Sequence, residues 1–157
     1  MEISPQIFAL FTAMAWGIGG FFEKQGLKLG GLTPQVGITI RTAIAFVVLG
    51  TYSFSQWKQI PQAGPKALTM MVLGGGVLAG SVGMLCFYTA IKHAPSLNHV
   101  MPIAFTSPLF GAIMGMLAPY IGKLLGLELA AEHLSPQMII GMVMTVGGIV
   151  LISLSHH

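Results

Sequence analysis

Glu23 and Arg41 stand out among the charged residues because each lies within or close to the end of a long apolar stretch. Glu23 comes about five residues before the predicted end of one membrane span, and Arg41 comes about seven after the start of the next. At about 1.5 Å of helical rise per residue, both lie roughly 8–10 Å from the same membrane surface. An ionisable group at that depth is costly and is usually paired. The spacing therefore predicts that Glu23 and Arg41 meet across a helical hairpin.

Two interpretations of this pair stay open. The pair is a structural ion pair, or it is a gate: Glu23 binds a proton or a cationic group, or Arg41 holds an anionic one, and the pair opens during transport. Lys24 is an alternative partner for Glu23. Its ammonium group otherwise extends to the membrane interface, as long cationic side chains do.

One face of the first apolar stretch carries Thr12, Trp16, Gly19 and Glu23, at helical steps of four, three and four. Trp16 lies near the middle of the stretch, with glycines beside it. A tryptophan at that depth fills a void between helices or forms the wall of a cavity. The cavity interpretation makes Trp16 a candidate substrate-binding residue.

A second polar face lies in the fourth apolar stretch, where Asn98, Pro102 and Thr106 repeat at steps of four. Pro102 and Pro108 free backbone carbonyls and bend a helix. Interrupted helices of this kind line substrate sites in transporters. The alternative is a proline kink whose hydroxyl groups bond to the preceding turn. Tyr88, in the third stretch, is a further candidate for the same pocket.

Catalytic and metal chemistry are not expected. The sequence has no aspartate, and no histidine shares a helix face with a carboxylate at ligand spacing. His93 and His99 are six residues apart and fall on different helix faces. The single cysteine, Cys86, excludes an internal disulfide and any cysteine-pair metal motif. We expect no enzyme activity and no cofactor.

The composition requires a bilayer as the solvent. The mean hydropathy is +0.82 and 7% of the residues are charged, whereas about 25% are charged in soluble domains. Five apolar stretches are each long enough to cross the hydrocarbon as a helix. We expect an all-α integral membrane protein, one domain over residues 1–157, with spans at about 6–28, 34–54, 66–92, 96–118 and 135–155.

The spans are separated by helix start and stop signals. Gly30, Gly31, Thr33 and Pro34 mark the turn after the first span, and Ser135 with Pro136 starts the last span as an N-cap followed by proline. Pro95 separates the third span from the fourth. The longest connection, from Pro119 to Leu134, is predicted to hold a short helix in the membrane interface. With Glu2 and no basic residue before it, the first stretch does not resemble a secretory signal, and we expect it to be retained.

The basic residues show almost no preference for one membrane face. Five spans place the termini on opposite faces, and orientation normally follows the excess of lysine and arginine. One face receives Lys58, Lys66 and Lys123, and the other receives Lys24, Lys28 and Lys92, with Arg41 deeper on that second side. Insertion in both orientations and orientation by a partner are both compatible with this balance. No basic run favours nucleic acid.

Small residues at four-residue spacing allow close helix contact in membranes. The pairs are Gly76 with Gly80 and Gly111 with Gly115. The last span has a stripe formed by Gly141, Thr145 and Gly148. We expect this stripe to be a subunit contact.

Several segments together resemble a known family. They are Ala15-Trp16-Gly17 with Lys24, Ile40-Arg41-Thr42, the block from Tyr88 to Ser96, Ser107-Pro108-Leu109-Phe110, and Gly141 through Gly148 to Leu151. The chain resembles the EamA-like domain of the drug/metabolite transporter superfamily, in its single-domain, five-helix form. The resemblance covers nearly the whole chain, and the Tyr88 to Phe110 region is its most specific part.

The resemblance implies a ten-helix architecture of two inverted five-helix halves that moves metabolites or drugs by alternating access. An antiparallel copy of the chain, or a second five-helix half, is the expected partner in the cytoplasmic membrane, and we expect Trp16, Tyr88, Asn98, Pro102 and Thr106 to face the substrate. Trp16 occupies the position of the membrane glutamate of small multidrug resistance proteins, so proton-coupled cation exchange is not implied. The family's short link resembles Ala131-Glu132-His133-Leu134-Ser135. The alternative function is a non-transporting accessory subunit of a larger membrane complex.

Overall fold

The computed structural model describes residues 5–131 and 133–154, and every regular element in these ranges is a helix. Glu2, Glu132 and the predicted end of the last span at residue 155 lie outside the described residues. Contacts group the chain into two compact units, Met1–Leu97 and Asn98–His157.

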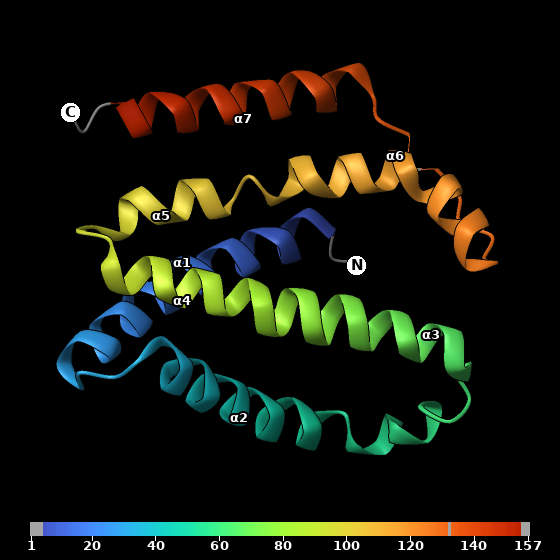
Figure 1. Cartoon of the computed structure of the whole chain (residues 1–157), viewed down its shortest axis with the longest axis horizontal. Helices are drawn as coiled ribbons and strands as arrows, with labels where there is room; N and C mark the ends of the chain where they lie inside the picture. Colours follow the sequence, from blue (N-terminus) through green and yellow to red (C-terminus); the bar gives the residue numbers. More distant parts are fainter. Residues whose placement is uncertain (1–4, 132, 155–157) are drawn as a thin grey trace. The chain divides into compact units, whose positions relative to one another are not determined.

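The first unit contains a helical hairpin and a long third rod. The hairpin is α1 (Pro5–Leu29) and α2 (Pro34–Tyr52), and a 3₁₀ helix, η1 (Phe54–Gln59), follows it. The rod is formed by α3 (Gly64–Met70), η2 (Met71–Gly83) and α4 (Met84–His93), which continue one another (Figure 1). The second unit contains α5 (Leu97–Ala104) from its second residue onward, α6 (Ser107–Leu125) and α7 (Pro136–Leu154).

The predicted helix starts are confirmed. The Val36 amide donates to the Thr33 hydroxyl over 3.4 Å, and the Met138 amide donates to the Ser135 hydroxyl over 3.3 Å. Each hydroxyl thereby satisfies one of the backbone donors that a helix N-terminus leaves without an intrahelical partner.

Four helical stretches are long and apolar enough to cross a membrane: Pro5–Leu29, Pro34–Tyr52, Gly64–His93 and Leu97–Leu125. A shorter apolar helix covers Pro136–Ile152. The all-helical fold is therefore confirmed, with four candidate membrane-spanning stretches, and the count of five spans stays a prediction.

The third rod differs from a regular α-helix. Over η2 the backbone adopts π-helical turns, and the Ser81 hydroxyl donates to the Gly76 carbonyl, five residues earlier, over 3.0 Å. A Cβ at Gly80 would lie 2.8 Å from the Gly75 carbonyl oxygen. A side chain at position 80 would therefore collide with the backbone of the preceding π-helical turn, and glycine avoids this collision.

The prediction of a separate interfacial helix after Pro119 is wrong. Instead, α6 runs through Pro119 to Leu125, and Gly126 ends it in the left-handed conformation, with φ 64°. The Leu127 amide then bonds back to the Gly122 carbonyl over 2.8 Å. A Cβ at Gly122 would lie 2.6 Å from the Leu127 carbonyl oxygen, so the described chain after α6 folds back closely against the helix end instead of starting a new helix.

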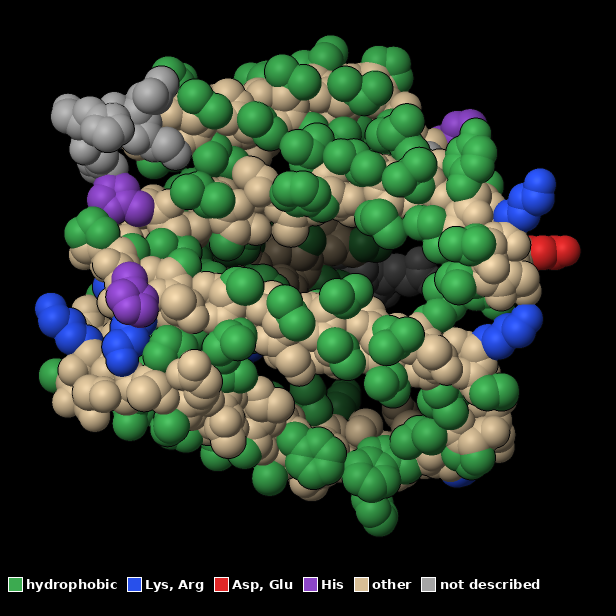
Figure 2. Space-filling view, in the orientation of Figure 1, with side chains coloured by type: hydrophobic (Ala, Val, Ile, Leu, Met, Phe, Trp, Pro, Cys, Tyr) green, Lys and Arg blue, Asp and Glu red, His purple; other side chains and the backbone are tan. Residues whose placement is uncertain are grey.

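Most apolar side chains of both units are exposed. Figure 2 shows hydrophobic side chains over the visible surface, and residues such as Phe46, Val47 and Leu124 are more than half exposed. Patches of this extent on a soluble monomer would be unusual, whereas lipid tails are an adequate solvent for them.

Candidate functional site

The ion pair between α1 and α2 is the centre of the candidate site. Arg41 Nε lies 2.9 Å from Glu23 Oε1, and the two side chains are 36% and 22% exposed, respectively. This geometry confirms that the two residues meet across the hairpin. Whether the pair is structural or acts as a gate stays a prediction.

Tyr88 brings the third helix into the same site. Its side chain is 2% exposed, and its hydroxyl faces the Glu23 carboxylate as a hydrogen-bond donor. A carboxylate only accepts hydrogen bonds, and it has room for both donors. Glu23 is therefore held by a guanidinium group from α2 and a phenol from α4.

Gly37 explains how the Tyr88 ring reaches the ion pair. A Cβ built on Gly37 would lie 2.6 Å from Leu27 Cδ2 and 2.9 Å from Tyr88 Cε1. Without a side chain at Gly37, α2 approaches the ring closely, as membrane helices with small residues do. Leu27, Tyr88 and Ile91 are buried here, so α1, α2 and α4 pack together at the end of the hairpin that carries its loop.

The polar groups open into an apolar cavity of about 690 Å³. Its polar side chains are those of Glu23, Arg41 and Tyr88. Its remaining wall comes from Phe22, Gly26, Leu27, Leu32, Gly37, Ile40, Ile44, Ala45, Val48 and Leu49. A volume of this size with few convergent polar groups is typical of small-molecule sites.

Lys24 does not take the role of Arg41. Its Nζ donates to the Ala94 carbonyl at the end of α4 over 2.8 Å. Lys92 makes the reciprocal contact, donating to the Leu32 carbonyl in the α1–α2 loop over 2.7 Å. Lys24 therefore connects the end of α1 to the end of α4, and Lys92 connects the end of α4 to the α1–α2 loop.

Trp16 lies on α1 seven residues before Glu23, 54% exposed, and it is not part of the cavity wall. Seven residues are close to two helical turns, so the two side chains lie on one face about 10 Å apart along the axis. Of the five predicted substrate-binding residues, Tyr88 is the one that lines this cavity.

Asn98, Pro102 and Thr106 belong to the second unit. The predicted interruption of the fourth span is present, because α5 ends at Ala104 and α6 begins at Ser107. The Thr106 hydroxyl donates to the Ile103 carbonyl over 2.7 Å, as in the kink interpretation. The break also forms part of a small cavity of about 40 Å³ that Thr106 and Thr145 line.

The predicted contact stripe on α7 has open space at two of its positions. A Cβ at Gly141 or Gly148 would meet no atom of the described chain within 4 Å, and the Thr145 hydroxyl bonds to the Gly141 carbonyl over 2.9 Å. Among the described residues, no group of three histidine, cysteine or acidic side chains is placed to bind a metal ion.

Comparison with protein families gives a match over residues 3–154, to the EamA-like transporter family. The chain belongs to this family. It is a multi-pass membrane protein of the drug/metabolite transporter type, and members of the family are transporters, not enzymes. No curated protein and no solved structure matches the chain.

The cavity of this EamA-like protein includes residues that the sequence interpretation did not single out. They are Gly37, Ile44 and Val48, which lie with Arg41 on one face of α2 at steps of four, three and four. That spacing was available from the sequence, and it extends the face of Arg41 in both directions. The contacts of Lys24 and Lys92 left no such signal, because they join residues 70 and 60 positions apart.

Proposed function

We propose that this EamA-like protein is one five-helix half of a secondary transporter for small metabolites or drugs in the cytoplasmic membrane. The observation that carries the proposal is the Glu23–Arg41 pair beside Tyr88 in the wall of an apolar cavity of about 690 Å³. An ion pair in lipid surroundings is expensive to form and maintain, and here it faces open space large enough for a ligand.

The site favours an amphipathic substrate with a compact charged group. An anionic group would pair with Arg41, and a cationic group with Glu23, while the apolar wall receives the body of the molecule. When the substrate's charged group replaces one partner of the Glu23–Arg41 pair, one charge-assisted contact replaces another. This replacement limits the free energy needed to separate the pair. The Tyr88 hydroxyl is placed to donate to Glu23 or to the substrate.

Alternating access requires a second half, and we propose an antiparallel copy of the same chain. Packing within the first unit is concentrated at the loop end of the hairpin, around Leu27, Tyr88 and Ile91. The remaining length of α1 and α2 presents side chains that an inverted partner would cover. In this assembly Trp16, Asn98, Pro102 and Thr106 also face the substrate, and Gly141, Thr145 and Gly148 on α7 contact the partner.

The Tyr88→Phe variant tests the proposed site. The purified chain is reconstituted into liposomes and screened for uptake of radiolabelled amphipathic amines, amino acids and organic anions, with empty liposomes as the background. For a transported compound, we expect Tyr88→Phe to lower the rate about fivefold, the value of one hydrogen bond of about 1 kcal/mol. The ring that packs on Gly37 is kept, so the fold is retained.

Tyr52→Phe is the matched control, because Tyr52 is 85% exposed and does not line the cavity. Equal uptake rates for the two variants would show that the Tyr88 hydroxyl has no part in substrate binding. Absence of uptake for every class of compound, together with co-purification of other chains in fixed stoichiometry, would favour an accessory subunit instead.

The antiparallel arrangement predicts insertion in both orientations. A reporter fused after His157 is expected to give a signal from each face of the native membrane, because the lysines are balanced at three on each predicted side. Adding two lysines to the loop between Trp57 and Gly64 should shift the signal to one face. A one-sided signal from the unaltered chain would require a different partner.

A further inference from the structure

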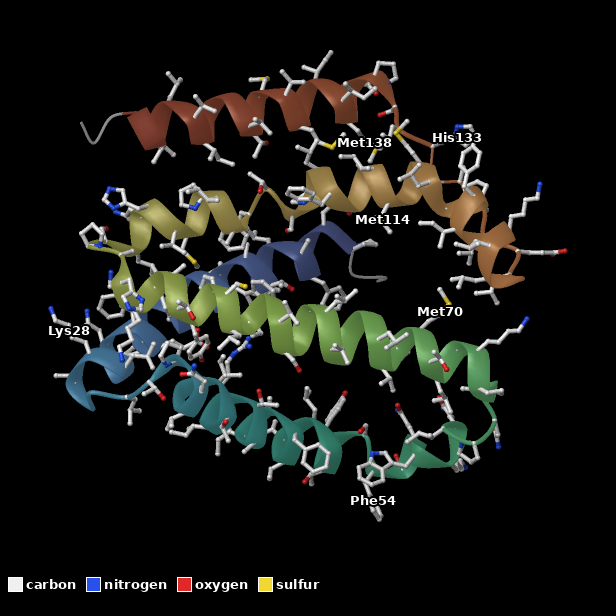
Figure 3. The ribbon with its side chains drawn as sticks, viewed as in Figure 1. Lys28, Phe54, Met70, Met114, His133 and Met138 are labelled. Carbon is white, nitrogen blue, oxygen red and sulfur yellow. The ribbon has the colours of Figure 1, made fainter. Side chains whose placement is uncertain are left out.

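A second cavity in the first unit is lined by three of the chain's lysines. It has a volume of about 380 Å³ and lies between the last turns of α1, the α1–α2 loop and the end of α4. Lys24, Lys28 and Lys92 contribute their side chains. Figure 3 labels Lys28, which extends from this end of the molecule, and Figure 2 shows cationic side chains gathered there.

The positive charge of this cavity has no counter-charge in the described part of the unit. Lys24 and Lys92 each bond to a neutral backbone carbonyl, which leaves two N–H donors on each ammonium group. The Lys28 side chain makes no hydrogen bond or ion pair with the described residues. The acidic side chain of this part of the chain, Glu23, is paired with Arg41.

The position of the cavity along the helices indicates the kind of anion. It lies where α1 and α4 end, and Leu29 beside it is 87% exposed, so charged and apolar surfaces meet there as they do at a membrane interface. Buried Leu27 and Ile91 form part of the wall. Basic pockets between membrane helices at this level bind the phosphate of lipid head groups.

We propose that Lys24, Lys28 and Lys92 form a binding site for a phosphate group, supplied by the head group of an anionic phospholipid. Two of the three ammonium groups are already oriented by their bonds to Ala94 and Leu32, which lowers the entropy lost on binding. A bound phosphate would bridge α1 and α4 at the packed end of the unit. This site is separate from the Glu23–Arg41 cavity and does not depend on transport.

Native mass spectrometry of the purified full chain in detergent tests the site, with phosphatidylglycerol and phosphatidylcholine of identical acyl chains as probes. We expect phosphatidylglycerol to be retained more strongly. Lys28→Gln should weaken its binding about fivefold, since a lysine near an anionic surface contributes about that factor. The combined Lys24→Gln, Lys28→Gln and Lys92→Gln variant should weaken it on the order of a hundredfold.

The matched control removes the same charge elsewhere, by Lys58→Gln, Lys66→Gln and Lys123→Gln, and should bind as the unaltered chain does. Equal binding by the two triple variants, or no preference for phosphatidylglycerol, would overturn the proposal. Lys28→Gln alone decides the matter if the pocket variant does not fold, because the Lys28 side chain has no hydrogen bond or ion pair to lose. Binding of inorganic phosphate with the same lysine dependence, without lipid binding, would replace the lipid by a soluble phosphate as the source.

Discussion

The Arg41→Met variant is expected to unfold with a free energy about 3 kcal/mol lower than that of the unaltered chain. In water, an ion pair this exposed would contribute at most about 1 kcal/mol. In lipid the dominant effect is different: the substitution leaves the Glu23 carboxylate without its partner, and an uncompensated charge at this depth costs about 3 kcal/mol. Denaturation by sodium dodecyl sulfate in bicelles, followed by circular dichroism, measures the difference.

Glu23→Gln should cost less than Arg41→Met. The orphaned Arg41 has a long side chain that extends toward the nearby membrane surface, whereas a glutamate is too short to do so. The double variant with Glu23→Gln and Arg41→Met should recover most of the loss, since neither charge then remains. If the two single losses simply add in the double variant, the pair has no coupling energy and Arg41 stabilises the chain by other contacts.

Gly37→Ala is expected to be the second strongly destabilising substitution, by about 3 kcal/mol, at the upper end of the usual cost of overpacking. The added methyl group would lie 2.6 Å from Leu27 Cδ2 and 2.9 Å from Tyr88 Cε1. Both neighbours are buried, 3% and 2% exposed, so neither side chain moves aside without displacing α1 or α4. The same denaturation assay gives the free energy.

Gly19→Ala provides the matched control, because a Cβ there meets no atom of the described chain within 4 Å. It should leave stability unchanged or raise it slightly, since alanine is the better helix former. Leu27→Ala combined with Gly37→Ala should be less destabilising than the sum of the two single changes, because the shorter side chain clears the contact. Equal losses at Gly19 and Gly37 would mean that helix propensity, and not close packing, decides the effect.

Arg41 and Gly37 both belong to the cluster of side chains around Tyr88 and Glu23, so a substitution at either position is expected to affect transport as well as stability. Tyr88 faces Glu23 from α4, and its ring rests on Gly37 of α2. A displacement of the ring therefore removes a donor from Glu23 as well as a packing contact. Gly37→Ala should consequently reduce uptake of a transported compound even under conditions in which the variant is folded.

Sequence patterns alone determined the features that depend on local chemistry. Hydropathy and charge indicated a membrane-embedded helical chain, because 7% charged residues is far below the usage of soluble domains and the apolar stretches are long enough to cross a bilayer. The hydroxyl and proline signals placed the starts of α2 and α7, since an N-cap acts on amides within its own helix. Even the Glu23–Arg41 pair was accessible, because its partners are joined by one short loop and their depth follows from helical rise.

Other features needed the tertiary structure. The packing of Tyr88 on Gly37 and the bonds from Lys24 and Lys92 join segments far apart in sequence, where spacing carries no information on contact. The sequence predicted that the fourth span ends before Pro119, but α6 continues through this proline to Leu125. A membrane helix can contain a proline when the preceding turn adjusts to satisfy the freed backbone groups. These features depend on the packing energy between segments that approach closely in the fold. Helix propensity and hydrophobic periodicity carry no information about that energy.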